Sequence, residues 1–212
     1  MQTNPATSVH APKHIVTVGK TVVLSSEDTR ALFESIDAST LIGLRDRALI
    51  GVMAYSFARI GAMLAMRVEN YLPIGKGWFL RLREKRRQAT RSPRALCARA
   101  YLDAYIEAAG LVAEPKAPLF CSALRRTGLL TRSPMRQRDA YKMIRRRALK
   151  AGIAAKIGCH TFRATGITNF LERGGALEEA QKIAAHSDTS TTKLYDRRGD
   201  KITRGSIERI SY

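Results

Sequence analysis

The stretch that decides the fold begins with His160-Thr161-Phe162-Arg163 and ends with the sequence AAHSDTSTTKLY at 184–195. On a helix, His160 and Arg163 are three positions apart and share one face, so an imidazole and a guanidinium can converge on one anion. His186 follows 23 residues after Arg163, and Tyr195 follows nine residues later, beyond a hydroxyl-rich helix start. The pattern predicts a polar site that binds an anion.

Two further motifs lie upstream. LRDRAL at 44–49 is followed by Phe57-Ala58-Arg59-Ile60, and Arg83-Glu84-Lys85 lies in a basic segment. With these motifs, the chain from about residue 20 to Tyr212 resembles the catalytic domain of the tyrosine recombinases, the phage integrase family. The resemblance implies a mainly α fold with a small antiparallel β-sheet (α+β). It also implies a catalytic set, with Tyr195 as the nucleophile, made of Arg59, Lys85, His160, Arg163, His186 and Tyr195.

The chemistry of the family explains these residue types. A phosphodiester under attack gathers negative charge on its non-bridging oxygens, which the guanidiniums of Arg59 and Arg163 can hold. Tyr195 forms a 3′-phosphotyrosine that conserves the energy of the bond for religation. His160 is expected to take the tyrosine proton, His186 to bind the phosphate or orient the tyrosine, and Lys85 to protonate the 5′-oxygen. No ATP, metal or other cofactor is implied.

The charge of the chain favours a polyanion as partner. Its 212 residues carry a formal net charge of +19. Residues 76–99 hold nine basic residues and one acidic residue, and residues 125–150 hold ten and one, so the rest of the chain is almost neutral. This concentration predicts one basic face that binds double-stranded DNA. Its expected contact residues are Arg83, Arg86, Arg87, Arg91, Arg136, Arg138, Lys142, Arg145 and Arg146.

Other classes of protein are not supported. No apolar run approaches the ~20 residues that a membrane span needs, and the first 18 residues do not resemble a signal peptide. The three cysteines form no CxxC pair, so neither a disulfide scaffold nor a zinc site is indicated. We expect a cytoplasmic, DNA-associated protein.

Hydrophobic periodicity gives the expected elements. Trp78, Leu80 and Leu82 alternate with polar or aromatic residues, which is typical of a strand and predicts a hairpin with a basic tip between 78 and 96. Ser133-Pro134 is expected to open a helix that reaches Lys150. The other expected helices cover about 25–36, 41–55, 63–66, 102–109, 161–173 and 177–185, several of them ended by glycine.

The resemblance also sets the expected domain organisation. Residues 1–21 are expected to form an extended arm or linker remnant, and residues 22–212 the catalytic domain, with the family's N-terminal core-binding domain absent. Family members assemble as tetramers on DNA, and Ile207 to Tyr212 is a candidate for the segment they exchange. Two departures are Arg86-Arg87-Gln88, where a glycine-rich turn is usual, and Ala185, where glycine is common.

Three alternatives to a recombinase remain open. A truncated integrase remnant would keep the basic face and bind DNA without cutting it. A topoisomerase would use the same chemistry and the same motifs. An RNA-binding protein ranks lowest, because stacking aromatics in the two basic segments are limited to Trp78, Phe79 and Tyr141.

Overall fold

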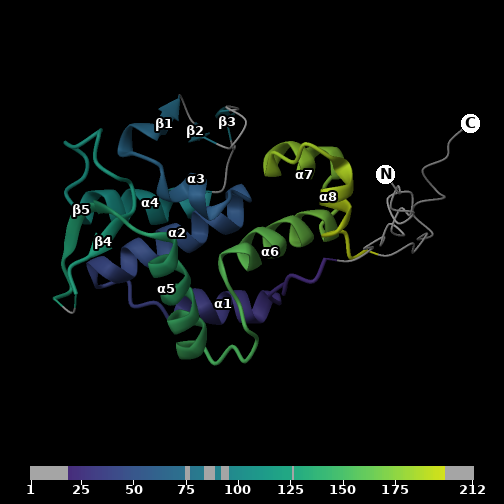
Figure 1. The fold of residues 1–212 in the computed structure, drawn as a ribbon, viewed down its shortest axis with the longest axis horizontal. Coiled ribbons are helices and arrows are strands. Elements are labelled where there is room, and N and C mark those ends of the chain that lie inside the picture. Colours follow the sequence, from purple (N-terminus) through teal and green to yellow (C-terminus); the bar gives the residue numbers. More distant parts are fainter. Residues whose placement is uncertain (1–18, 75–76, 84–88, 92–95, 126, 199–212) are drawn as a thin grey trace, which may run out of the picture.

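The computed structural model describes residues 19–74, 77–83, 89–91, 96–125 and 127–198. These residues are mostly helical, as the sequence predicts, and they form two small antiparallel sheets where the sequence predicts one (Figure 1). The α-helices in the described part of the chain are α1 (Ser26–Glu34), α2 (Leu41–Ser56), α3 (Ile60–Leu64), α4 (Leu96–Ala108), α5 (Gln137–Lys150), α6 (Cys159–Glu172), α7 (Leu177–Ala184) and α8 (Thr189–Lys193).

The first sheet contains the predicted hairpin and one additional strand. Its antiparallel order is β1 (Tyr71–Ile74), β2 (Gly77–Arg83) and β3 (Ala89–Arg91), and the short 3-10 helix η2 (Val68–Asn70) leads into β1. Leu80 and Leu82 are buried while Arg81 is exposed, so the alternation seen in the sequence is the alternation of the two sheet faces. The hairpin tip at 84–88, which includes Lys85, lies outside the described residues.

The central helix is α2, which lies across the middle of the view in Figure 1. Ala48, Leu49, Val52 and Met53 are fully buried, and the helix packs mainly against α4 and α6. The contact with α6 is close, because a Cβ added at Gly166 would lie 2.2 Å from the carbonyl oxygen of Ala54. This contact fixes α6, which carries His160 and Arg163, on the main core.

A second, smaller cluster of buried residues holds the C-terminal helices together. It contains Phe57, Ile167, Leu171, Ala180 and Ala184. α6, α7 and α8 lie together at the right of Figure 1, and the cluster fills the space between α6, α7 and the end of α2. The elements that carry His186 and Tyr195 are therefore attached to the main core through α6 and the end of α2.

One predicted helix start is wrong. Ser133-Pro134 does not open a helix but ends strand β5 (Leu130–Pro134), which pairs with β4 (Cys121–Ala123) in a second hairpin that the sequence did not indicate. The amide of Met135 donates to the carbonyl oxygen of Phe120 (2.9 Å) and Met135 is buried, so this pairing holds the chain extended. α5 therefore begins later, at Gln137.

Apart from the start of α4, the other predicted helix boundaries agree with the structure within a few residues. The short helix expected at 63–66 is α3 at 60–64, and α4 begins earlier than predicted, at Leu96. Gly110, Gly152 and Gly174 follow α4, α5 and α6 with φ of 63°, 74° and 87°, which is the left-handed conformation that ends helices.

Within the described ranges, no helix is long and apolar enough to span a membrane.

Candidate active site

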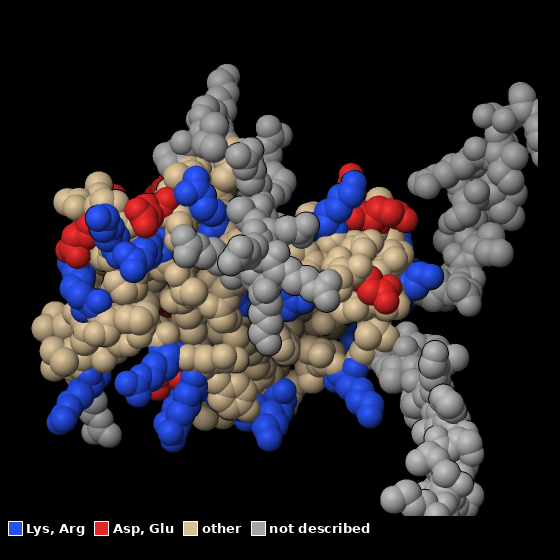
Figure 2. Space-filling view, turned by 45° about the horizontal axis from the view of Figure 1, so that its top comes forward, with Lys and Arg blue, Asp and Glu red and all other residues tan. Residues whose placement is uncertain are grey.

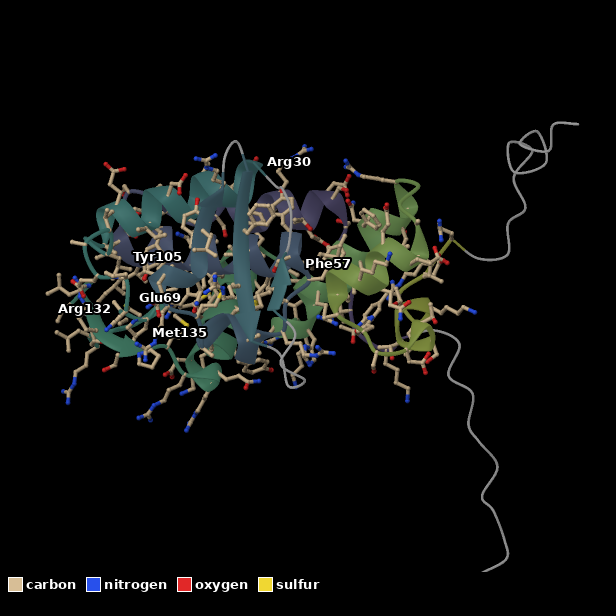
Figure 3. The ribbon with its side chains drawn as sticks, turned by 90° about the horizontal axis from the view of Figure 1, so that it is seen from above. Arg30, Phe57, Glu69, Tyr105, Arg132 and Met135 are labelled. Atoms are coloured by element: carbon tan, nitrogen blue, oxygen red, sulfur yellow. The ribbon has the colours of Figure 1, made fainter. Side chains whose placement is uncertain are left out.

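Arg163 lies at the centre of the candidate site. It is 3% exposed, and its guanidinium donates hydrogen bonds to the carbonyl oxygens of Phe57 and Ala184, the latter at 2.6 Å. Phe57 follows the last residue of α2, and Ala184 is the last residue of α7. Figure 3 shows Phe57 between the body of the domain and helices α6 to α8. Arg163 therefore joins three helices at the point where their ends meet.

The turn after α2 places Arg59. Phe57 has φ of 53° and ψ of 17°, a left-handed conformation that reverses the chain directly after the helix. Arg59 then occupies the N-cap position of α3 with an extended backbone, and its side chain is exposed. The first predicted arginine thus lies two residues from the carbonyl that Arg163 binds, at the surface of the same site.

His186 is buried beside both arginines. It is 8% exposed, and its Nδ1 atom lies 2.8 Å from the hydroxyl oxygen of Thr192. Burial first, and then the positive charges of Arg163 and Arg59, lower the pKa of His186 to about 4. The imidazole is therefore neutral at pH 7. The positive charges of Arg163 and Arg59 both contribute to the lowered pKa of this ring.

Tyr195 lies against His186. The two rings are stacked, with centroids 6.0 Å apart and planes at 8°. The Tyr195 amide donates to the carbonyl oxygen of Thr192 (3.0 Å), and the Thr168 hydroxyl donates to the Tyr195 carbonyl oxygen (2.9 Å). The tyrosine is half-buried and packs on the smaller hydrophobic cluster. Its backbone is thus held from both α8 and α6.

His160 lies apart from these contacts. It is exposed in the first turn of α6, where it lines an open pocket of about 380 Å³. The pocket is formed by the starts of three helices, and its other lining residues are Ile60, Gln137, Arg138, Tyr141, Gly158 and Cys159. Because Ile60 follows Arg59, this pocket opens beside the exposed arginine. His160 and Arg163 therefore differ in burial, although they lie three positions apart on one helix.

The basic residues predicted to bind DNA are divided between two regions. Arg136, Arg138, Lys142 and Arg146 are exposed and Arg145 is half-buried, all at the start of α5 or along it. Figure 2 shows Lys and Arg side chains projecting in a row along the lower edge of one face. In the hairpin, Arg83 and Arg91 lie on β2 and β3, whereas Lys85, Arg86 and Arg87 are outside the described residues.

Sequence reasoning missed the groups that hold this site together. They are the carbonyl oxygens of Phe57 and Ala184 and the hydroxyls of Thr168 and Thr192. Backbone acceptors leave no trace in a sequence, but the hydroxyl-rich stretch before Tyr195 was a signal for Thr192.

In the part of the chain that the structure describes, no three His, Cys, Asp or Glu residues are grouped so that they could hold a metal ion.

Residues 22–201 match the sequence pattern of the phage integrase family, and the chain belongs to that family. It is 29% identical over 174 residues to tyrosine recombinase XerD of Staphylococcus aureus strain N315, covering 82% of this chain and 57% of the relative. It is 27% identical over 197 residues to tyrosine recombinase XerD of Listeria innocua, covering 92% of this chain and 63% of the relative. The chain thus spans about three fifths of the length of these curated relatives.

Solved structures share the fold. The crystal structure of XerA recombinase superimposes with a TM-score of 0.69 at 24% identity, covering 90% of this chain and 66% of that one. The pre-cleavage complex of XerH site-specific recombinase with its difH substrate gives a TM-score of 0.68 at 19% identity, covering 88% and 52%. These likenesses confirm the predicted fold class.

Proposed function

We propose that this protein is a site-specific DNA recombinase, or integrase, that cuts and rejoins DNA strands through a 3′-phosphotyrosine at Tyr195. The observation that carries the proposal is that Arg163, His186 and Tyr195, far apart in sequence, meet in one site on which the charge of Arg59 also acts. Membership of the phage integrase family supports it, as do relatives named tyrosine recombinases.

In the proposed reaction, the Tyr195 hydroxyl oxygen attacks the phosphorus of a DNA phosphodiester. The new bond joins phosphorus to the tyrosine, and the bond to the 5′-oxygen breaks, leaving a 3′-phosphotyrosine and a free 5′-hydroxyl. Arg59 and Arg163 hold the non-bridging oxygens as negative charge develops on them. A 5′-hydroxyl from another strand then reverses the step, so no bond energy is lost and no nucleotide or metal cofactor is required.

The proton movements are assigned to three residues. With its pKa lowered to about 4, His186 is a weak base, which favours a role as a neutral hydrogen-bond donor to the phosphate. His160 is the second imidazole of the set, and its exposed position suits a group that accepts the tyrosine proton and passes it to solvent. Lys85, outside the described residues, is assigned the proton for the 5′-oxygen.

The proposed partner is double-stranded DNA, bound in part along α5. Arg138, Lys142 and Arg145 follow one another at helical spacing on its surface, whereas Arg147 turns inward to a buried carboxylate. Arg136 and Arg146, which are exposed, extend this surface, and the arginines predicted at positions 83, 86, 87 and 91 are proposed as further DNA contacts. Self-assembly on DNA is also proposed, because a structural neighbour, lambda integrase, has been solved as a tetramer bound to a Holliday junction. The proposed site of action is the cytoplasm.

The deciding experiment uses a DNA duplex nicked near the cleavage point, so that the freed end diffuses away and the covalent complex accumulates. The duplexes come from a library of mobile-element junctions, and a chelator is present throughout. Wild type is compared with Tyr195→Phe and with Tyr55→Phe, a change at an exposed tyrosine of α2. We expect a covalent protein–DNA band from wild type and from Tyr55→Phe but not from Tyr195→Phe.

A different result would change the functional class. If wild type formed no covalent band, yet bound DNA in a salt-dependent manner that Tyr195→Phe left unchanged, the chain would be a non-catalytic DNA-binding protein. A band that persisted in Tyr195→Phe would assign the nucleophile to another residue.

The DNA surface can be tested separately through its salt dependence. The logarithm of DNA affinity falls linearly with the logarithm of salt concentration. Each basic side chain that neutralises a DNA phosphate makes this fall steeper by about 1. The double variant Arg138→Ala, Lys142→Ala should therefore bind DNA more weakly, and the magnitude of its salt slope should be smaller by about 2. Arg30→Ala, an exposed arginine on α1, serves as the matched control and should leave the slope unchanged.

A further inference from the structure

Thr192 contacts both His186 and Tyr195. Its side chain is completely buried in α8, and its hydroxyl oxygen lies 2.8 Å from Nδ1 of His186. Its carbonyl oxygen accepts the hydrogen bond of the Tyr195 amide at 3.0 Å. One residue thus joins the buried imidazole to the proposed nucleophile.

The direction of the hydrogen bond between Thr192 and His186 matters for function. A neutral imidazole carries one N–H, so one ring nitrogen donates and the other accepts. The low exposure of His186 and the nearby charges of Arg163 and Arg59 keep this ring neutral at pH 7. The group bonded to Nδ1 therefore decides whether Nε2 carries the proton.

The burial of the hydroxyl settles that direction on physical grounds. Within the described part of the chain, Nδ1 of His186 is the hydrogen-bond partner of the Thr192 hydroxyl. If the imidazole donated through Nδ1, the hydroxyl proton of Thr192 would be buried without an acceptor, which is costly. If the hydroxyl donates to Nδ1, its proton is satisfied and the imidazole proton resides on Nε2.

We propose that Thr192 is a positioning residue that holds His186 in the tautomer with its proton on Nε2, ready to donate to a phosphate oxygen of DNA. The donation to a DNA phosphate rests on the proposed function, whereas the tautomer of His186 does not depend on it. Because the carbonyl of the same residue binds the Tyr195 amide, the hydrogen-bond donor and the nucleophile are set by one turn of α8.

The first test is nuclear magnetic resonance of the full chain with ¹⁵N-labelled histidine. Correlations between the ring nitrogens and carbons identify the tautomer, and His186→Gln identifies the signals of His186. We expect wild type and Thr192→Ser to show the tautomer protonated at Nε2. Thr192→Val, which keeps the shape of the side chain and removes the hydroxyl, should show a mixture of tautomers. A wild-type signal protonated at Nδ1 would overturn the proposal.

A titration of the same signals gives an independent readout. A hydroxyl that donates to Nδ1 stabilises the neutral ring, so its removal in Thr192→Val should raise the pKa of His186. If the imidazole were the donor, the charged ring would lose a partner and the pKa would fall. A fall in Thr192→Val would therefore contradict the proposal, and Thr192→Ser should stay at the wild-type value.

The second test is the rate of covalent complex formation on the nicked duplex. We expect Thr192→Val to be at least ~10-fold slower than wild type, as is typical when a hydrogen-bond donor is misplaced, with unchanged DNA affinity and rescue by Thr192→Ser. An unchanged rate alongside a changed tautomer would refute the positioning role. If wild type formed no complex, the proposed function would fail, while the tautomer result would stand by itself.

Discussion

Arg163 on α6 donates a hydrogen bond to the carbonyl oxygen of Phe57, which ends α2 in the left-handed conformation with φ of 53°. A left-handed residue other than glycine costs about 1–2 kcal/mol, so this turn requires support from its surroundings. The ring of Phe57 supplies part of it by packing edge-on against Phe170, with centroids 6.2 Å apart. Arg163 supplies a further part, and so it stabilises the fold as well as serving the proposed reaction.

Replacing Arg163 with lysine should therefore destabilise the domain. An ammonium cannot reproduce the planar fork that spans Phe57 and Ala184, so at least one buried carbonyl is left without its donor. We expect a loss of about 2–4 kcal/mol in the free energy of unfolding, measured by urea denaturation. Arg173→Lys, at an exposed position after α6, is the control and should be neutral. Equal stability of the two variants would show that the hydrogen bonds of Arg163 to these carbonyls contribute little.

A substitution at Ala185, in contrast, should stabilise the domain. This residue has φ of 49° and ψ of 46°, so it occupies the left-handed position where glycine has no steric cost. Ala185→Gly should raise the free energy of unfolding by about 1 kcal/mol. Ala184→Gly is the matched control, because Ala184 is helical and buried and should lose about 1 kcal/mol. Thermal unfolding shifted in opposite directions by the two variants would confirm this interpretation.

Asp46 forms a buried ion pair between α2 and α5. Its carboxylate lies 2.6 Å from Arg45 and 2.7 Å from Arg147, and it is fully buried. Asp46→Asn should leave the guanidiniums of Arg45 and Arg147 without a counter-charge and cost about 3–5 kcal/mol in unfolding free energy.

The control for Asp46→Asn is an ion pair of the same type at the surface. Glu114 lies 2.8 Å from Arg132, but the two side chains are about half exposed, at 41% and 50%. Glu114→Gln should therefore change the unfolding free energy by less than about 1 kcal/mol. Equal effects of the two substitutions in urea denaturation would contradict the role assigned to burial.

The sequence was sufficient wherever a pattern repeats along one element. The apolar spacing of α2 and the alternation around Leu80 and Leu82 predicted a helix and a strand, and the structure confirms both. Glycines predicted the ends of α4, α5 and α6, because those turns require a positive φ. Of the six residues that the resemblance singled out, Arg59, Arg163, His186 and Tyr195 lie together, whereas His160 lies apart and Lys85 is outside the described residues.

The sequence was insufficient where the partner is a backbone atom or lies far along the chain. Ser133-Pro134 has the local chemistry of a helix start, yet its pairing with β4 keeps it extended. The acceptors of Arg163 are carbonyls at positions 57 and 184, which no side-chain pattern encodes. The unequal burial of His160 and Arg163 likewise follows from how α6 packs, since their spacing alone places both on one face.

The buried state of His186 predicts a dependence of stability on pH. Its pKa in the folded protein is about 4, because burial and then Arg163 and Arg59 disfavour the charged ring. An unfolded histidine titrates near ~6.5, so between these values the unfolded chain binds more protons than the folded chain. Stability should therefore be lost as the pH falls from about 6.5 towards 4, by about 2 kcal/mol after allowance for solvent screening.

This dependence can be isolated with two histidine variants. His186→Gln removes the titrating ring, so its unfolding free energy should change less than that of wild type between about pH 6.5 and pH 4. His160→Gln changes an exposed histidine and should keep the wild-type slope. The measurement is urea denaturation at several pH values in this window. If His186→Gln kept the full wild-type slope, the loss of stability in acid would have to come from the carboxylates.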